Sequence, residues 1–126
     1  MIALNSFSPD EWVAEVGDLG ALASRQLSDV VAAFNERNKE KAITVWASDE
    51  QIDDTYTGIY RRLIDYMKAD PSRVHIGTHL LFIAKNIERI GDHATNIAES
   101  IHYLVTGETI TGPRPKGDKS SMDLVA

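Results

Sequence analysis

Apolar residues recur in steps of three and four along three long stretches of this chain, which is the spacing of one face of an α-helix. The second stretch follows the pattern throughout, at Ala42, Val45, Ile52, Tyr56, Ile59, Leu63 and Tyr66. Asp49 falls on the same series, where a helix bundle normally places an apolar side chain. The pattern predicts an amphipathic helix that carries a carboxylate on its buried face.

The first and third stretches have the same spacing. The first comprises Trp12, Val16, Leu19, Ala23, Leu27, Val30 or Val31, and Phe34; the third comprises Ile76, Leu80, Ile83, Ile87, Ile90, Ala94, Ile97, Ile101 and Leu104. We expect both series to face the core, and no alternating strand pattern competes with them.

Residues that typically begin or end a helix separate the three predicted helices. Pro9, after a capping Ser8, is typical of a helix start, and the polar residues 35–39 are typical of a turn. Pro71 interrupts the next junction, and Gly107 is placed to end the last helix. Each of the two junctions is short.

Three long helices with short connections predict an all-α fold, an antiparallel up-down-up three-helix bundle. We place the bundle at residues 8–107. Residues 108–126 are rich in Gly, Pro, Lys and Ser without periodicity, so we expect a flexible C-terminal tail.

Composition narrows the function classes. The 126 residues suit one domain, and the absence of cysteine excludes thiol catalysis, disulfides and cysteine-bound zinc. A net charge of -6 argues against nucleic acid as a partner. No apolar run reaches transmembrane length, and residues 1–7 lack signal-peptide features. We expect a soluble, cytoplasmic, acidic domain.

Two pairs of carboxylates stand out on the predicted helices. Asp49 and Asp53 are four residues apart, as are Glu88 and Asp92, so each pair occupies one helix face. If the two helices fold back about Pro71, both pairs lie at similar distances from the turn and therefore at the same height.

Four carboxylates within roughly 5 Å would repel by about 3 kcal/mol per pair at an effective dielectric constant near 20. A bound cation would relieve this repulsion, and oxygen ligands favour magnesium, manganese, calcium or iron, with zinc also compatible. The spacing therefore suggests a metal site at Asp49, Asp53, Glu88 and Asp92. Gly91 removes a side chain beside the cluster, and we expect an ion or partner to approach there.

Two other interpretations stay open. The acids could form a charged face balanced by Arg61, Arg62, Lys85 and Arg89. Glu99 and His102 have the Glu-x-x-His spacing of di-iron bundles, but those bundles need two copies and this chain has one. No nucleophile stands beside the carboxylates, which disfavours an acid–base enzyme.

The segment from Leu80 to Glu99 resembles the last helix of PhoU, a family of bacterial phosphate-signalling regulators. Residues 103–108, 49–56 and 66–71 continue the likeness, which covers about residues 12–108. The run Glu88 to Glu99, ERIGDHATNIAE, is its most specific part. PhoU proteins are typically built from two similar three-helix units, and this chain resembles the second.

The resemblance also implies a site and its ion. PhoU proteins carry Glu/Asp-x-x-x-Asp motifs that hold iron or zinc clusters on the bundle surface. These motifs fall on Asp49, Asp53, Glu88 and Asp92 of this sequence. The expected cofactor is thus a divalent or trivalent ion, with iron, zinc, manganese and magnesium as candidates.

The resemblance further implies a cytoplasmic, non-enzymatic negative regulator of phosphate uptake. Such a protein would bridge the ATPase of the phosphate ABC transporter and a sensor histidine kinase, and would reach the membrane only through these partners. A single unit is expected to expose apolar surface and to form homo-oligomers. The rival functions are a metal-dependent enzyme or metal-handling bundle, and a metal-free helical interaction module.

Overall fold

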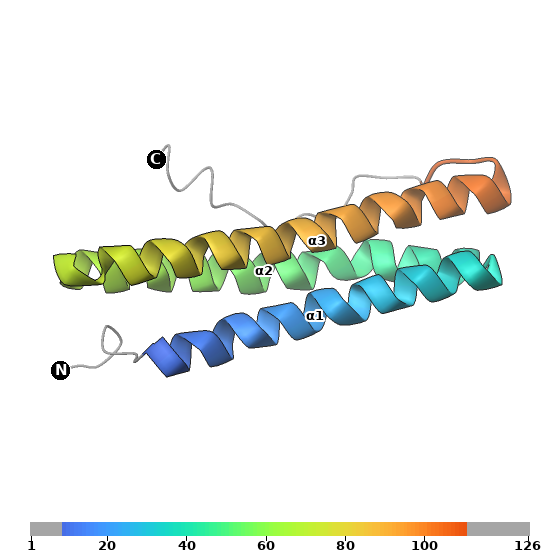
Figure 1. Cartoon of the computed structure of the whole chain (residues 1–126). Helices are drawn as coiled ribbons and strands as arrows, with labels where there is room; N and C mark the ends of the chain where they lie inside the picture. Colours follow the sequence, from blue (N-terminus) through green and yellow to red (C-terminus); the bar gives the residue numbers. More distant parts are fainter. Residues whose placement is uncertain (1–8, 111–126) are drawn as a thin grey trace.

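The computed structural model describes residues 9–110 and consists of three long helices packed side by side (Figure 1). Helix α1 spans Pro9–Glu36, α2 spans Lys39–Ala69 and α3 spans Val74–Thr106, with a short 3-10 helix, η2, at Pro71–Arg73. The chain runs up, down and up, which confirms the predicted all-α three-helix bundle. Residues 111–126, most of the predicted tail, lie outside the described residues.

The junctions form through local side-chain hydrogen bonds. The Asn38 side chain accepts a hydrogen bond from the Lys41 backbone N–H at 3.0 Å and so caps α2. Asp70 accepts hydrogen bonds from the Ser72 backbone N–H at 3.0 Å and hydroxyl at 2.9 Å, and these bonds lower the pKa of Asp70. Pro71 follows directly and begins η2.

Gly107 ends α3 as predicted. Its φ of 75° lies in the left-handed region that favours glycine, and its N–H donates to the Tyr103 carbonyl at 2.7 Å. None of the helices within residues 9–110 is long and apolar enough to cross a membrane.

The buried side chains form two apolar clusters. One contains Trp12, Val16, Leu19, Ala23, Ile52, Tyr56, Ile59, Tyr60, Leu63, Tyr66, Leu80 and Ala84. The other contains Val30, Ala33, Ala42, Val45, Ala94, Ala98 and Ile101. Between them, near the middle of the bundle, lies a buried polar layer made of Gln26, Asp49, Asp53, Glu88 and Thr95.

Helix α2 buries all the residues that the sequence pattern assigned to its inner face, Asp49 included. The prediction for α3 was wrong at five of its nine positions, whereas Leu80, Ala94 and Ile101 are buried and Ile87 packs against the core. Ile76, Ile83, Ile90, Ile97 and Leu104 are exposed, whereas the inner face comprises Gly77, Leu80, Ala84, Glu88, Gly91, Ala94, Thr95, Ala98 and Ile101. Small inner residues let α1 and α2 approach α3 closely.

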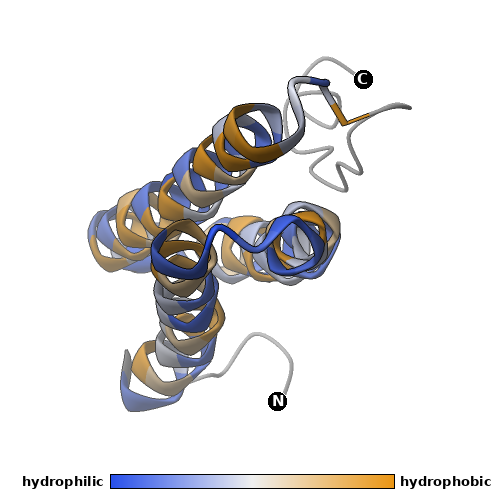
Figure 2. Ribbon diagram, turned by 90° about the vertical axis from the view of Figure 1, so that its right-hand side faces the viewer, coloured by the Kyte–Doolittle hydropathy of each residue, from blue (hydrophilic) through white to orange (hydrophobic). Residues whose placement is uncertain are grey.

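Two positions near the end of the α1 series were also misassigned, because Leu27 and Phe34 are exposed and Gln26 and Ala33 take the inner positions. Of the alternatives Val30 and Val31, Val30 is the buried one. In Figure 2, where apolar residues are orange, these residues are seen both between the helices and on their outer sides.

Gly77 is required by the contact of α3 with α2. A Cβ atom built on Gly77 would lie 2.4 Å from Met67 Cγ and 2.6 Å from Met67 Sδ, so the Met67 side chain or the helix that carries it would have to move. At Gly58 the nearest atom is the end of the Arg62 side chain, at 3.8 Å, which leaves room for a methyl group.

We predict that Gly77→Ala lowers the free energy of unfolding by about 1–2 kcal/mol, because overpacking outweighs the better helix propensity of alanine. Gly58→Ala, the matched control, should raise it by up to about 1 kcal/mol. Urea unfolding followed by circular dichroism measures both. A gain of equal size in the two variants would show that Gly77 is not needed for close packing.

Candidate metal centre

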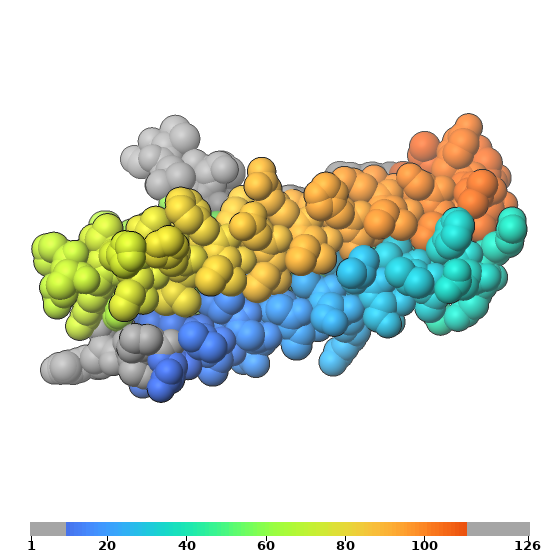
Figure 3. Space-filling model, in the orientation of Figure 1, coloured from blue at the N-terminus to red at the C-terminus, as the bar shows by residue number. Residues whose placement is uncertain are grey.

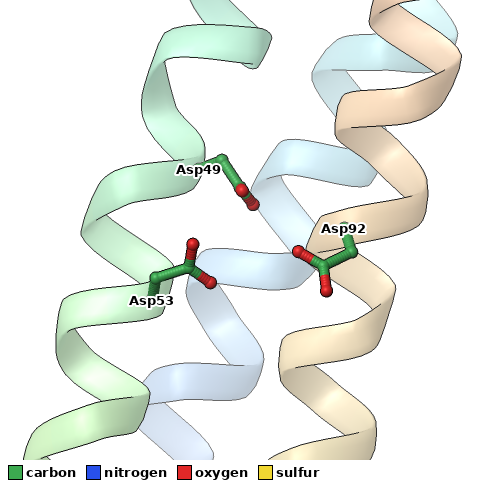
Figure 4. A group of neighbouring side chains, drawn as sticks. All are labelled: Asp49, Asp53 and Asp92. Carbon is green, nitrogen blue, oxygen red and sulfur yellow. The ribbon is translucent and has the colours of Figure 1, made fainter. Parts of the chain in front are cut away.

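Three aspartates meet between α2 and α3. Asp49 and Asp53 project from α2 toward Asp92 on α3, with α1 behind them (Figure 4). One carboxylate oxygen from each lies within 4.8 Å of the others. Asp49 and Asp53 have no exposed surface, and Asp92 is half-buried. We inferred from the sequence that the two acidic pairs lie at the same height along the bundle. Three of the four predicted site residues do lie together.

The chemistry of this oxygen set suits a cation. Ionised carboxylates at such distances repel by about 3 kcal/mol or more per pair at an effective dielectric constant near 20. Oxygens bound to one ion at about 2.1 Å lie about 3.0 Å apart when adjacent and about 4.2 Å apart when opposite, so the three side chains would have to close around an ion. Carboxylate oxygens bind magnesium, manganese, iron and zinc alike, so the set does not select among them.

Glu88 is placed differently. Its side chain is fully buried, and its Oε1 lies 3.1 Å from Lys85 Nζ on the preceding turn. The same ammonium group lies 5.1 Å from the centre of the Tyr56 ring on α2. Of the cations that the sequence offered to the acidic face, Lys85 thus pairs with Glu88, and Arg62 pairs with Glu15 of α1.

Gln26 was missed by the sequence reasoning, which assigned Leu27 to the inner face instead. Gln26 is 3% exposed, and its side-chain amide nitrogen lies 3.2 Å from the Val45 carbonyl, 3.2 Å from Ser48 Oγ and 3.4 Å from Thr95 Oγ1. Its two N–H groups are shared among these acceptors on α2 and α3. The signal available in the sequence was its place seven residues after Leu19 and seven before Ala33.

Gly91 faces the bundle interior and not an ion or a partner, contrary to expectation. A Cβ atom there would lie 3.0 Å from Gln26 Oε1 and 3.2 Å from Ile52 Cδ1. The missing side chain therefore makes room for α1 and α2 at the level of the carboxylates. Gln26 and Gly91 together set how closely the three helices approach beside the site.

Glu99 and His102 do not join the carboxylates. Glu99 Oε2 accepts a hydrogen bond from the Trp46 indole N–H at 3.0 Å, and His102 Nδ1 lies 2.8 Å from the Glu108 carbonyl. In the described part of the chain, Asp49, Asp53 and Asp92 are the group of three potential ligands close enough to share an ion.

The family model for the PhoU domain matches residues 16–101 of this chain. The chain belongs to the PhoU family. The match covers most of all three helices and includes Asp49, Asp53, Glu88 and Asp92, so family membership confirms the resemblance drawn from the sequence.

Curated relatives agree with the family assignment. The chain is 51% identical over 100 residues to a phosphate-specific transport system accessory protein PhoU homolog of Caulobacter vibrioides, and the aligned part covers 79% of this chain and 44% of the relative. A homolog of the same name from Rhizobium meliloti is 52% identical over 103 residues, 82% of this chain and 44% of the relative. The chain thus spans about half the length of these PhoU relatives. No solved structure matches it.

We predict that Gln26→Ala lowers the free energy of unfolding by about 1–3 kcal/mol, because it removes the buried hydrogen bonds from α1 to α2 and α3. Gln51→Ala, at an exposed position on α2, is the matched control and should change it by less than about 0.5 kcal/mol. Thermal and urea unfolding measure both values. Similar values for the two variants would rule out Gln26 as a link between the helices.

Proposed function

We propose that this chain is a regulatory unit of a phosphate transport system and that it acts without catalysis, as an adaptor. The observation that carries the proposal is the match to the PhoU domain over residues 16–101. The relatives are named as accessory proteins of a phosphate-specific transport system. We extend this accessory role to the present chain, which spans about half the length of those relatives.

We further propose that Asp49, Asp53 and Asp92 hold a metal ion, with Glu88 as a fourth ligand. The support is the convergence of three carboxylate oxygens within 4.8 Å, two of them on fully buried side chains. Iron, zinc, manganese or magnesium each suits this oxygen set. Binding by Glu88 would require its carboxylate to exchange the Lys85 ammonium group for the ion.

The ion would supply positive charge at the junction of α2 and α3. Asp49 and Asp53 belong to α2 and Asp92 belongs to α3, so a shared ion would stabilise the contact of these two helices. Rigid helices position carboxylates better than loops do, and this favours a site that forms with the fold. The half-buried Asp92 is the ligand nearest to solvent and to a docking protein.

The partners that we propose are the ATPase of a phosphate ABC transporter and a sensor histidine kinase, both reached in the cytoplasm. The net charge of -6 favours basic patches on such partners and disfavours nucleic acid. Contact with the membrane would come only through them. Phosphate uptake and the starvation response would then be restrained through one adaptor.

The rival function, a metal-dependent enzyme or metal-handling bundle, lacks comparable support. The Glu-x-x-His motif at Glu99 and His102 is occupied by other contacts, with Trp46 and with the Glu108 carbonyl. A metal-free interaction module differs from our proposal only in the site, so elemental analysis separates the two.

We predict that protein purified without chelator or histidine tag contains bound metal, and that Asp49→Asn/Asp53→Asn contains none. The double variant keeps the shape of the side chains and removes two ligand charges. Elemental analysis by mass spectrometry measures the content. Chelation should destabilise the parent by about 2–3 kcal/mol if the ion was present at about a hundred times its Kd, and should leave the variant unchanged.

Asp54→Asn is the control, because Asp54 is exposed on α2 beside Asp53 and its substitution removes a carboxylate charge outside the site. This variant should retain the metal. Absence of metal from the parent, after exposure to each candidate ion, would leave the metal-free module in place. Equal metal content in parent and double variant would contradict the assignment of the site.

We predict that the immobilised chain binds the purified transporter ATPase and the cytoplasmic part of the sensor kinase from the same genome. Surface plasmon resonance measures both interactions, with Asp54→Asn beside Asp49→Asn/Asp53→Asn. If the ion shapes the docking surface, only the double variant should bind about tenfold or more weakly. Failure to bind either partner would contradict the adaptor function and leave the metal site to be judged by its own measurement.

A further inference from the structure

Helix α3 carries two histidines one turn apart near its start. His75 and His79 are four residues apart, so both side chains lie on one face of the helix. Both are exposed, and Figure 3 shows α3, yellow to orange, along the outside of the molecule. The pair follows η2, at the end of the bundle where α2 turns into α3 (Figure 1). This end is remote from the carboxylates, because His79 and Asp92 are about 20 Å apart along the helix.

The two imidazole rings already lie at the distance of a metal chelate. Their centroids are 4.8 Å apart, with an interplanar angle of 82°. An imidazole nitrogen binds a transition ion at about 2.0–2.1 Å, which puts the ring centroid about 3.2 Å from the ion. Two rings on one ion therefore have centroids about 4.5 Å apart at an octahedral angle and about 5.2 Å apart at a tetrahedral angle. The observed distance falls between these two values.

The rings can turn without losing this distance. The Cβ–Cγ bond of a histidine points through the middle of its ring, so rotation about χ2 moves the nitrogens while the ring centre stays nearly in place. The χ2 torsion of histidine has broad minima, so such a rotation costs little. The helix backbone therefore fixes the spacing of the two rings, and ring rotation aims their nitrogens at a shared ion.

The nitrogens of the pair are available to an ion. Within residues 9–110, His75 and His79 contact each other's rings and take part in no hydrogen bond or ion pair. His102 differs, because its Nδ1 lies 2.8 Å from the Glu108 carbonyl. An ion at the pair would thus displace no contact of the bundle.

The nearest cationic side chain along the chain belongs to Arg73, two residues before His75. Its guanidinium lies 4.7 Å from the centre of the Tyr66 ring, and its Nη1 lies 3.4 Å from the Tyr66 carbonyl. Its Nε lies 3.9 Å from the Asp70 carboxylate. These contacts hold the guanidinium at the end of α2, where its charge is partly balanced by Asp70.

The ligand chemistry selects a narrower class of ions than the carboxylates do. Two histidines at positions i and i+4 of a helix are the metal-binding part of the His-Glu-x-x-His motif of zinc hydrolases. Ile76 stands where that motif has its general base, so the pair can bind an ion but has no base to activate water. Imidazole nitrogens favour zinc, copper and nickel over magnesium and manganese.

We propose that His75 and His79 form a second metal site, which takes one borderline divalent ion such as zinc or nickel. No third histidine or carboxylate of residues 9–110 lies close enough to share the ion, so water fills its other positions. Two protein ligands hold an ion reversibly, and gel filtration removes it. The metal that purified protein retains therefore reports the carboxylates, and the histidine site stands or falls independently of them.

The test uses the untagged full chain with Asp49→Asn/Asp53→Asn, which removes the carboxylate site and leaves the histidines. We expect this background to bind one nickel ion per chain in isothermal titration calorimetry, and one zinc ion in the same way. Adding His75→Asn should weaken nickel binding about tenfold or more, because one arm of the chelate is lost. His79→Asn should have the same effect.

His93→Asn is the matched control, because His93 is exposed on the same helix and has no histidine four residues away. It should leave the nickel affinity of the background unchanged. The substituted histidines are all exposed, so the variants should keep their helices, which circular dichroism checks. Equal nickel affinity with His75→Asn and with His93→Asn would overturn the site. Absence of nickel and zinc binding at millimolar ion would overturn it too.

Nuclear magnetic resonance identifies the ligands with all four histidines of the chain in place. In the same background, zinc should shift the ring-proton signals of His75 and His79 together and leave those of His93 and His102 unchanged. Magnesium should shift none of them, since it binds oxygen in preference to imidazole. Equal shifts of all four histidines, or a shift of only one member of the pair, would contradict a shared ion.

Discussion

The buried polar layer in the middle of the bundle is the constraint on which the rest of this structure depends. Asp49, Asp53 and Glu88 have no exposed surface and lie between two apolar clusters. Buried charges are stable only where hydrogen bonds, opposite charges or a metal compensate their lost hydration. Any sliding of one helix along another would break these contacts, so the layer fixes the register of the three helices. The apolar clusters on either side supply the driving force for packing and would tolerate such a shift more easily.

Close approach of the helices follows from the same constraint. Short carboxylate side chains on α2 can reach Asp92 only if α3 is near, and around Asp92 the inner face of α3 accordingly consists of the small residues Gly91, Ala94 and Thr95. Gln26 completes the layer from α1, with Gly91 leaving the space that its side chain needs. The site is therefore a product of the packing of all three helices, although its ligands come from only two of them.

The sequence predicted the number, order and ends of the helices because Pro9, Pro71 and Gly107 act locally through backbone geometry. It also placed Asp49 on a buried face and brought Asp49 and Asp92 to the same height, since helix rise and one sharp turn determine that register. It could not identify the inner face of α3. Two series of apolar residues lie side by side there, and periodicity alone does not distinguish the series that packs inside from the one that faces outward.

The failure on α3 is informative about function. Hydrophobicity ranked Ile83, Ile90 and Ile97 above Ala84, Gly91 and Ala98, whereas close packing in the bundle selects the smaller residues for the inside. Residues two apart on a helix point to nearly opposite sides, so Ile90 and Asp92 place the exposed aliphatic row and the carboxylates on opposite flanks of α3. Because both flanks belong to one helix, an ion that shifts α3 relative to α2 would also shift the exposed row.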